Sequence, residues 1–265
     1  MPTVKVNDLE MYYEIHGEEN EIPLVLIMGL SGDVTGWTFQ IPEFSKNYKV
    51  IAFDNRDAGR TSKTDIRYTI DTMAEDTYHL LNKLKVGKAH ILGASMGGTI
   101  AQTLALKHPE IVRSLILACT LGRAPKGINF LNVGKELIQV LPQELFIKQN
   151  LLWTFTRESL ENEVFITMGL KMMQENPYIQ PPEAFIRQSE ASEKFDVMDR
   201  LKDIKAPTLV LVGDRDVLTP IWYAEEIASR IRNAELKVIP GCGHGMPFEK
   251  AGEFNKAVLD FLEKH

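Results

Sequence analysis

Cysteine, long apolar runs and clustered positive charge are all scarce in this sequence of 265 residues. The two cysteines, Cys119 and Cys242, are too few for a disulfide framework, so we expect free thiols. No stretch approaches the length of a membrane span, and residues 1–10 are polar, which predicts a cytoplasmic protein. The net charge is −6 without a dense Lys/Arg run, so neither nucleic acid nor an anionic membrane is an expected partner.

What remains is the composition of an ordinary globular protein. Hydrophobic residues make up 44% and charged residues 25% of the chain, well outside disordered compositions. A chain of this length is expected to fold around one large core, with room for an insertion. We find no internal repeat and no low-complexity tract, and the sequence leaves a monomer and a homo-oligomer equally open.

Short apolar runs alternate with helical patterns along most of the chain. Residues 4–6 and 10–15 predict an opening hairpin. The later runs suit strands covered on both faces, at residues 24–27, 49–53, 90–92, 114–119, 208–212 and, more weakly, 236–239. Helical spacing of apolar residues occurs at 69–84, 96–107, 221–231 and 248–264. This alternation predicts the α/β class, with a doubly wound, mostly parallel sheet and helices on both faces.

Residues 122–195 break the alternation, because they contain helix-like segments and no convincing strand. The segments are 131–141, 145–155, 159–174 and 182–192. A helical insertion between two strands of a parallel sheet is most simply a cap over the carboxyl edge of the strands, where such sheets bind ligands. We therefore expect a core in two parts, 1–121 and 196–265, with a helical cap at 122–195.

Large apolar side chains are frequent in the predicted cap. Trp153, Phe155, Met168 and Met172 are candidates for the substrate pocket, and together they suggest a substrate with a hydrophobic part. Packing of cap helices onto the core is the alternative role for each of them.

The strongest chemical motif is Gly93-Ala94-Ser95-Met96-Gly97-Gly98, which matches G-x-S-x-G between a predicted strand and a predicted helix. A serine at such a turn has a strained backbone. We expect Gly93, Gly97 and Gly98 to be small because side chains there would collide with the elements that the turn brings together. Ser95 is therefore the candidate nucleophile.

A serine hydroxyl is a weak nucleophile, so this hypothesis requires an imidazole and a carboxylate. His244 follows the last predicted strand on a glycine-rich loop, which we expect to be flexible, whereas each of the other histidines has an ordinary structural explanation. Asp214 and Asp216 both follow the strand at 208–212. We choose Asp216 as the acid because it lies deeper in its loop, and we expect Asp214 to shape the turn.

These residues, in the order Ser95, Asp216 and His244, resemble the α/β-hydrolase superfamily. The resemblance covers essentially the whole chain and is closest to small carboxylesterases, 3-oxoadipate enol-lactonases and aclacinomycin-type methylesterases. The segment from Phe53 to Ser62 also resembles a loop that is structural in relatives, so we expect no catalytic role for Asp54, Arg56 or Asp57.

The resemblance also implies an oxyanion hole. The family's loop usually reads His-Gly-x, and here it reads Met28-Gly29-Leu30. The chemistry needs only the backbone N–H of the third residue, so Leu30 and Met96 are the expected donors. Relatives that open epoxides or remove halogens carry an aspartate at the position of Ser95, so a serine points to acyl transfer.

We therefore expect hydrolysis of small to medium, partly hydrophobic carboxylic esters through an acyl-enzyme, with no metal or organic cofactor. An enol-lactonase, a C–C bond hydrolase and a perhydrolase would use the same three residues and stay open as alternatives. So does a slow-turnover ligand receptor that has kept the fold.

Overall fold

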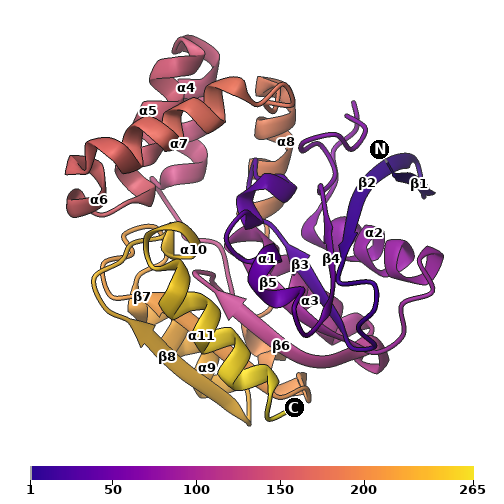
Figure 1. Cartoon of the computed structure of the whole chain (residues 1–265). Helices are drawn as coiled ribbons and strands as arrows, with labels where there is room; N and C mark the ends of the chain where they lie inside the picture. Colours follow the sequence, from indigo (N-terminus) through magenta and orange to yellow (C-terminus); the bar gives the residue numbers. More distant parts are fainter. Residues whose placement is uncertain (1) are drawn as a thin grey trace.

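An eight-stranded sheet forms the centre of the molecule, which a computed structural model describes for residues 2–265 (Figure 1). The strand order is β1-β2-β4-β3-β5-β6-β7-β8. The strands are β1 (Thr3–Val6), β2 (Leu9–His16), β3 (Pro23–Ile27), β4 (Lys49–Phe53), β5 (Ala89–Ala94), β6 (Val112–Ala118), β7 (Thr208–Gly213) and β8 (Ala234–Ile239). β1 and β2 form the predicted hairpin, and β2 pairs antiparallel with β4. All other neighbours are parallel, as the sequence predicts.

The strand order reverses at the middle of the sheet. From β3 the chain moves outward to β4, and it then returns past β3 to β5 on the other side. Such a reversal opens a crevice beyond the carboxyl ends of the two central strands, because the loops that follow them run to opposite faces. The loop after β3 and the turn after β5 therefore meet at one place.

Two helical layers cover the sheet. The buried side chains of α2 (Ile70–Lys83), α3 (Met96–Lys107) and α9 (Ile221–Arg230) belong to one apolar cluster. Those of α1 (Ile41–Phe44), α10 (Met246–Glu249) and α11 (Ala251–Leu262) belong to the cluster on the opposite face. Most strands are buried on both faces, which explains their continuous apolar runs. The edge strand β8 departs from this expectation, because Glu235, Leu236, Lys237 and Val238 are exposed.

Two of the predicted helices are each divided in two. The predicted helix 248–264 is α10 and α11, separated at Lys250, whose φ of −132° and ψ of 47° are not helical. The segment 159–174 is α6 (Arg157–Glu161) and α7 (Glu163–Glu175). Asn162 separates them in an extended conformation, and its side chain caps α7 by accepting a hydrogen bond from the Phe165 N–H.

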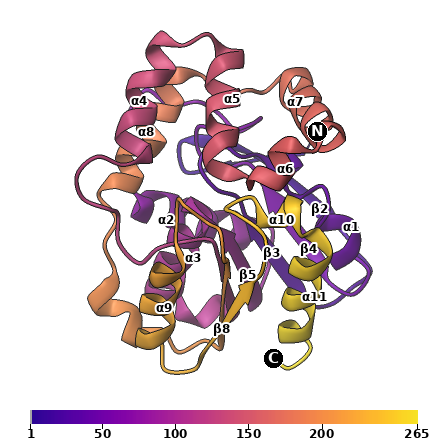
Figure 2. The ribbon, with the colours of Figure 1, turned by 90° about the vertical axis from the view of Figure 1, so that its left-hand side faces the viewer.

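Five helices are inserted between β6 and β7. They are α4 (Phe130–Val140), α5 (Gln143–Thr154), α6, α7 and α8 (Pro182–Glu193). In both views these helices form a layer of their own above the sheet (Figure 1, Figure 2). The chain leaves and re-enters the core at one point, where Arg123 and Asp196 form an isolated antiparallel bridge. The Ala124 N–H also donates to the Phe195 carbonyl at 2.8 Å, which closes the neck of the insertion.

Within residues 2–265, no helix combines the length and the apolar character that crossing a membrane would require.

Candidate active site

Ser95 stands on the sharp turn between β5 and α3. Its backbone has φ 55° and ψ −121°, a conformation that residues with a side chain rarely adopt. Hydrogen bonds hold the turn in place: the Ser95 N–H donates to the Ala118 carbonyl at 2.9 Å, and the Thr120 hydroxyl donates to the Ser95 carbonyl at 2.7 Å. The strained backbone lifts the hydroxyl clear of both the strand and the helix.

The glycines around Ser95 permit this close packing. A Cβ on Gly93 would lie 2.2 Å from the Gly97 carbonyl oxygen, and one on Gly97 would lie 2.0 Å from the Ile27 carbonyl oxygen. A Cβ on Gly98 would lie 2.6 Å from the side chain of Thr120. These contacts agree with the expectation that only glycine fits the three positions.

The structure brings His244 to Ser95 although 149 positions separate them in the sequence. His244 follows β8, and its Nε2 lies 2.9 Å from Ser95 Oγ. Its Nδ1 lies 2.9 Å from Oδ2 of Asp216, which follows β7. The three predicted residues thus form one continuous chain of hydrogen bonds. A neutral imidazole in this chain accepts the serine proton on Nε2 and donates from Nδ1.

Asp216 is almost fully buried, with 4% of its surface exposed. Its Oδ1 accepts hydrogen bonds from the N–H groups of Leu218 and Thr219, at 2.9 and 2.8 Å. Its Oδ2 also accepts one from the Thr219 hydroxyl at 2.7 Å. Burial by itself would raise the pKa of Asp216, but His244 and the Thr219 donors outweigh it and lower that pKa. The carboxylate therefore stays ionised beside the imidazole.

Asp214 has a different role. Its Oδ1 accepts a hydrogen bond from the Gly241 N–H at 2.7 Å, and its own N–H donates to the Ile239 carbonyl. These bonds join the loop after β7 to the loop after β8. Asp214 therefore shapes the turn, and it is Asp216 that contacts the imidazole.

The expected oxyanion loop lies beside the nucleophile. A Cβ on Gly29 would lie 3.0 Å from Ser95 Cβ, so the loop comes close to the nucleophile at a residue without a side chain. Met96 is the first residue of α3, so its N–H has no carbonyl one turn earlier to bond. Leu30, the other expected donor, directly follows Gly29. The roles of Leu30 and Met96 as donors stay predictions.

Met28, which stands where relatives carry histidine, fills a niche made by two glycines. A Cβ on Gly32 would lie 2.3 Å from Met28 Cγ, and one on Gly36 would lie 2.3 Å from Met28 Cε. The Met28 carbonyl accepts a hydrogen bond from the Asn55 amide at 2.8 Å. The departure from the family pattern is thus accommodated by packing.

The cap binds the next residue of the same loop. Ser31 has φ 63°, and its N–H donates to Gln188 Oε1 of α8 at 3.0 Å. Its hydroxyl donates to Gln180 Oε1 at 2.5 Å. Gln180 and Gln188 could not be predicted from the sequence, because polar contacts across 149 and 157 positions leave no local pattern.

Two of the four expected pocket residues lie near the catalytic loops. Trp153 and Phe155 line a surface depression together with Gly243 and Val217, the neighbours of His244 and Asp216. Met168 and Met172 are 60% and 42% exposed on α7. Their part in a pocket, like that of Trp153 and Phe155, stays a prediction.

The buried cysteines and the loop at residues 54–62 have structural roles. Burial raises the pKa of Cys242 to about 12, so its thiol is protonated and unreactive at neutral pH.

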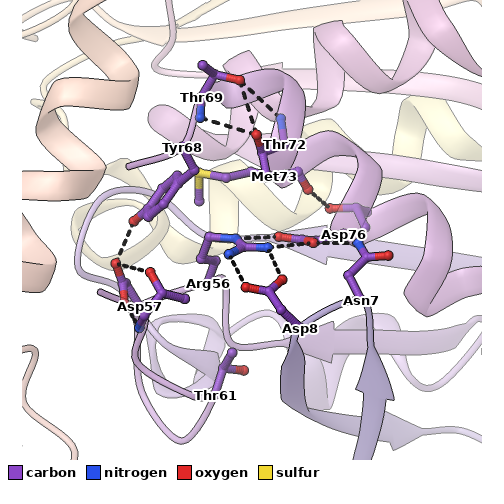
Figure 3. A network of polar contacts seen from close by, with 12 residues as sticks. Asn7, Asp8, Arg56, Asp57, Thr61, Tyr68, Thr69, Thr72, Met73 and Asp76 are labelled. Carbon is purple, nitrogen blue, oxygen red and sulfur yellow. Dashed lines mark hydrogen bonds and ion pairs between the residues drawn. The ribbon is translucent and has the colours of Figure 1, made fainter. Parts of the chain in front are cut away.

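Arg56 lies between Asp8 and Asp76, with nitrogen–oxygen distances of 2.8 to 3.0 Å (Figure 3). The Tyr68 hydroxyl donates to Asp57 at 2.9 Å in the same network. These contacts occupy the charged groups of the loop.

The chain is similar in sequence to known proteins over most of its length. Residues 22–141 match the family model described as alpha/beta hydrolase fold, and residues 186–265 match the one described as TAP-like protein. The curated protein "Putative non-heme bromoperoxidase BpoC" of Mycobacterium tuberculosis (strain H37Rv) is 32% identical over 91% of this chain and 93% of its own length.

Two solved structures extend the similarity to the whole fold. The enol-lactonase from Burkholderia xenovorans LB400 superposes with a TM-score of 0.91 at 27% identity, covering 99% of this chain and 100% of its own. A thermophilic esterase from Thermogutta terrifontis has a TM-score of 0.88 at 26% identity, covering 100% of this chain and 99% of its own.

Proposed function

Because the chain belongs to the α/β-hydrolase family, we propose that it hydrolyses carboxylic esters through an acyl-enzyme formed on Ser95. One observation carries the proposal: Ser95, His244 and Asp216 are joined by two hydrogen bonds of 2.9 Å. In this arrangement each group has the partner that its role in acyl transfer requires.

The mechanism follows from the geometry. His244 Nε2 takes the proton of Ser95 Oγ as this oxygen attacks the ester carbonyl. The resulting oxyanion accepts hydrogen bonds from the N–H groups of Leu30 and Met96, of which Met96 also offers the positive end of the α3 dipole. His244 then gives its proton to the leaving alcohol, and the acyl group stays on Ser95. A water molecule then gives a proton to the same imidazole and attacks the acyl-enzyme. As the bond from the acyl carbon to Ser95 Oγ breaks, His244 returns this proton to Ser95 Oγ and the acid is released.

The ionised Asp216 stabilises the imidazolium that forms in each step. It also fixes the tautomer that exposes a basic Nε2 to Ser95. The proposed substrates are small to medium, partly hydrophobic esters, because the inserted helices carry many large apolar side chains. The alternatives use the same three residues: enol-lactone hydrolysis, C–C bond hydrolysis and perhydrolysis differ in the substrate and not in the nucleophile.

Steady-state rates on p-nitrophenyl esters of graded acyl length test the proposal. We expect multiple turnovers in the wild type and a loss of kcat on the order of a millionfold in Ser95→Ala, by comparison with other serine triads. Circular dichroism of the variant controls for folding. A folded Ser95→Ala protein that keeps more than a small fraction of the activity would show that another residue is the nucleophile. Slow wild-type turnover combined with a stable ligand complex would favour the alternative that the protein is a ligand receptor.

A further inference from the structure

The peptide groups on both sides of His244 are bonded outside their own loop. The Gly245 N–H donates to the Thr154 carbonyl at the end of α5, at 2.8 Å. The Gly243 N–H donates to Glu249 Oε2 at 2.6 Å. The loop that carries the base, residues 241–245, is therefore held by hydrogen bonds on each side of His244, whereas its glycines predict a flexible loop. We call it the base loop.

The carboxylate of Glu249 continues the connection into the cap. Its second oxygen, Oε1, accepts hydrogen bonds from both the N–H and the hydroxyl of Thr156, each at 2.7 Å. Thr156 caps α6 at the junction with α5. Glu249 lies at the end of α10, 93 positions further along the chain. One side chain thus joins the base loop to the α5–α6 junction through three hydrogen bonds of 2.6 to 2.7 Å.

The two glycines beside His244 allow the junction to lie this close. A Cβ on Gly245 would lie 2.3 Å from the ring of Phe155, and one on Gly243 would lie 3.0 Å from the Thr154 carbonyl oxygen. The rings of Phe155 and Phe248 add an edge contact, with centroids 6.4 Å apart. Residues 154–156 therefore form a support on which the base loop rests.

From these contacts we infer that Glu249 is a positioning residue, which holds His244 Nε2 at the distance from Ser95 Oγ that proton transfer needs. The inference rests on the proposed function. Both carboxylate oxygens accept hydrogen bonds from donors of the chain itself, so the role assigned to Glu249 is exerted through the loop of His244. Because an error of about 1 Å in a catalytic group can reduce the rate a hundredfold, the connection affects kcat more than KM.

Substitution of Glu249 separates positioning from simple support of the fold. In Glu249→Ala the hydrogen bonds to Gly243 and to Thr156 are lost. We expect kcat to fall roughly 10- to 100-fold while KM stays within about threefold. Glu249→Gln keeps the shape and one good acceptor, so its loss should be smaller. Glu253→Gln, which changes an exposed glutamate at the start of α11, is the matched control and should keep the wild-type kcat. Thermal melts establish that each variant is folded.

A second measurement does not depend on turnover. In protein labelled with ¹⁵N-histidine, Glu249→Gln should shift the ring resonances of His244 and leave those of the other five histidines in place. If the wild type hydrolyses none of the esters but this shift occurs, the proposed function is wrong and the positioning role stands. If Glu249→Gln and Glu249→Ala are folded, keep kcat within about twofold of wild type and leave the His244 resonances unmoved, the positioning role is refuted.

Discussion

The carboxylate of Asp216 accepts more hydrogen bonds than the orientation of His244 alone requires. Leu218 and Thr219 bond Oδ1, and the Thr219 hydroxyl shares Oδ2 with the imidazole. These donors fix the position of the acid before the imidazole binds it. The site is therefore preorganised for the moment at which His244 becomes positively charged.

Substitution of the two aspartates in this loop should give very different results. Asp216→Asn removes the charge and the acceptor that select the His244 tautomer, so we expect kcat to fall by about 10⁴. Asp214→Asn should stay within about tenfold of wild type, because an asparagine oxygen can still accept the Gly241 N–H. Parallel kcat measurements on both variants decide the matter, and the opposite ranking would make Asp214 the acid.

His90 should make stability depend on pH. It is buried in β5 with Nδ1 2.7 Å from Ser114 Oγ, and burial, with smaller effects of Arg113 and His265, lowers its pKa from 6.5 to about 4. Between these values the unfolded chain binds a proton that the folded chain does not. Stability from this group is therefore complete above pH 6.5 and is lost as the pH falls toward 4.

The expected loss is roughly 3 kcal/mol at most. Urea unfolding at pH 7.5, 5.5 and 4.5 in wild type and His90→Gln measures it, because glutamine has no such titration. The difference between the two proteins should shrink as the pH falls. Parallel pH profiles would show that His90 does not contribute.

At the scale of elements, helix α8 of the cap contacts the oxyanion loop. Gln188 is fully buried, and it accepts from the Ser31 N–H and donates to the Arg56 carbonyl at 2.7 Å. Arg187, its neighbour, binds the carboxylate of Asp57 at 2.7 Å. The same helix therefore contacts the loops after β3 and β4.

Gln188→Met should reduce both stability and activity. It leaves the buried Arg56 carbonyl without this donor, at about 1–3 kcal/mol, and it removes the side-chain acceptor of the Ser31 N–H beside Leu30. Urea unfolding and kcat measured on the same preparation test this. The control is Gln139→Met, because Gln139 is exposed on α4 and bonds only within its own helix. If Gln188→Met and Gln139→Met have the same unfolding free energy and the same kcat, the expected role of α8 is contradicted.

The elements of the core were predictable because their signals are local. The turn at Ser95 shows itself in glycine spacing, and the positions of Asp216 and His244 follow from the strands that precede them. The break at Lys250 was not predictable, since the apolar spacing continues across it. Nor was Glu249, whose partners lie in a different part of the chain and leave no pattern around it.

At the scale of the whole molecule, the cap and the core divide the work less completely than the sequence suggests. The predicted catalytic and oxyanion residues all lie outside 122–195. Even so, Thr154 bonds the base loop directly, Thr156 is joined to it through Glu249, and Gln188 bonds the oxyanion loop. Backbone and polar side chains of the cap support the catalytic loops, and we expect its apolar side chains to contact the substrate.

We expect those side chains to set the preferred substrate size. Trp153 and Met172 are 46% and 42% exposed, and so are open to contact by a ligand. Trp153→Ala and Met172→Ala should shift the preferred acyl length, at roughly 1–3 kcal/mol for each methylene accepted or refused. Turnover of the acetate ester should stay within about tenfold of wild type. A series of p-nitrophenyl esters measures this, and a uniform loss across all lengths in folded variants would contradict it.

The neck of the insertion, where Arg123 pairs with Asp196, also bears on how such a protein can diversify. Since the excursion returns to the place where it departs, its length can change without altering the path of the surrounding strands. Doubling the length of a flexible loop costs only about 0.6 kcal/mol in closure entropy. Helical caps of other lengths can therefore be inserted at this neck with little loss of folding free energy. A replacement cap would have to supply a carbonyl for the Gly245 N–H, a donor for Glu249 and an acceptor for the Ser31 N–H, as Thr154, Thr156 and Gln188 do here.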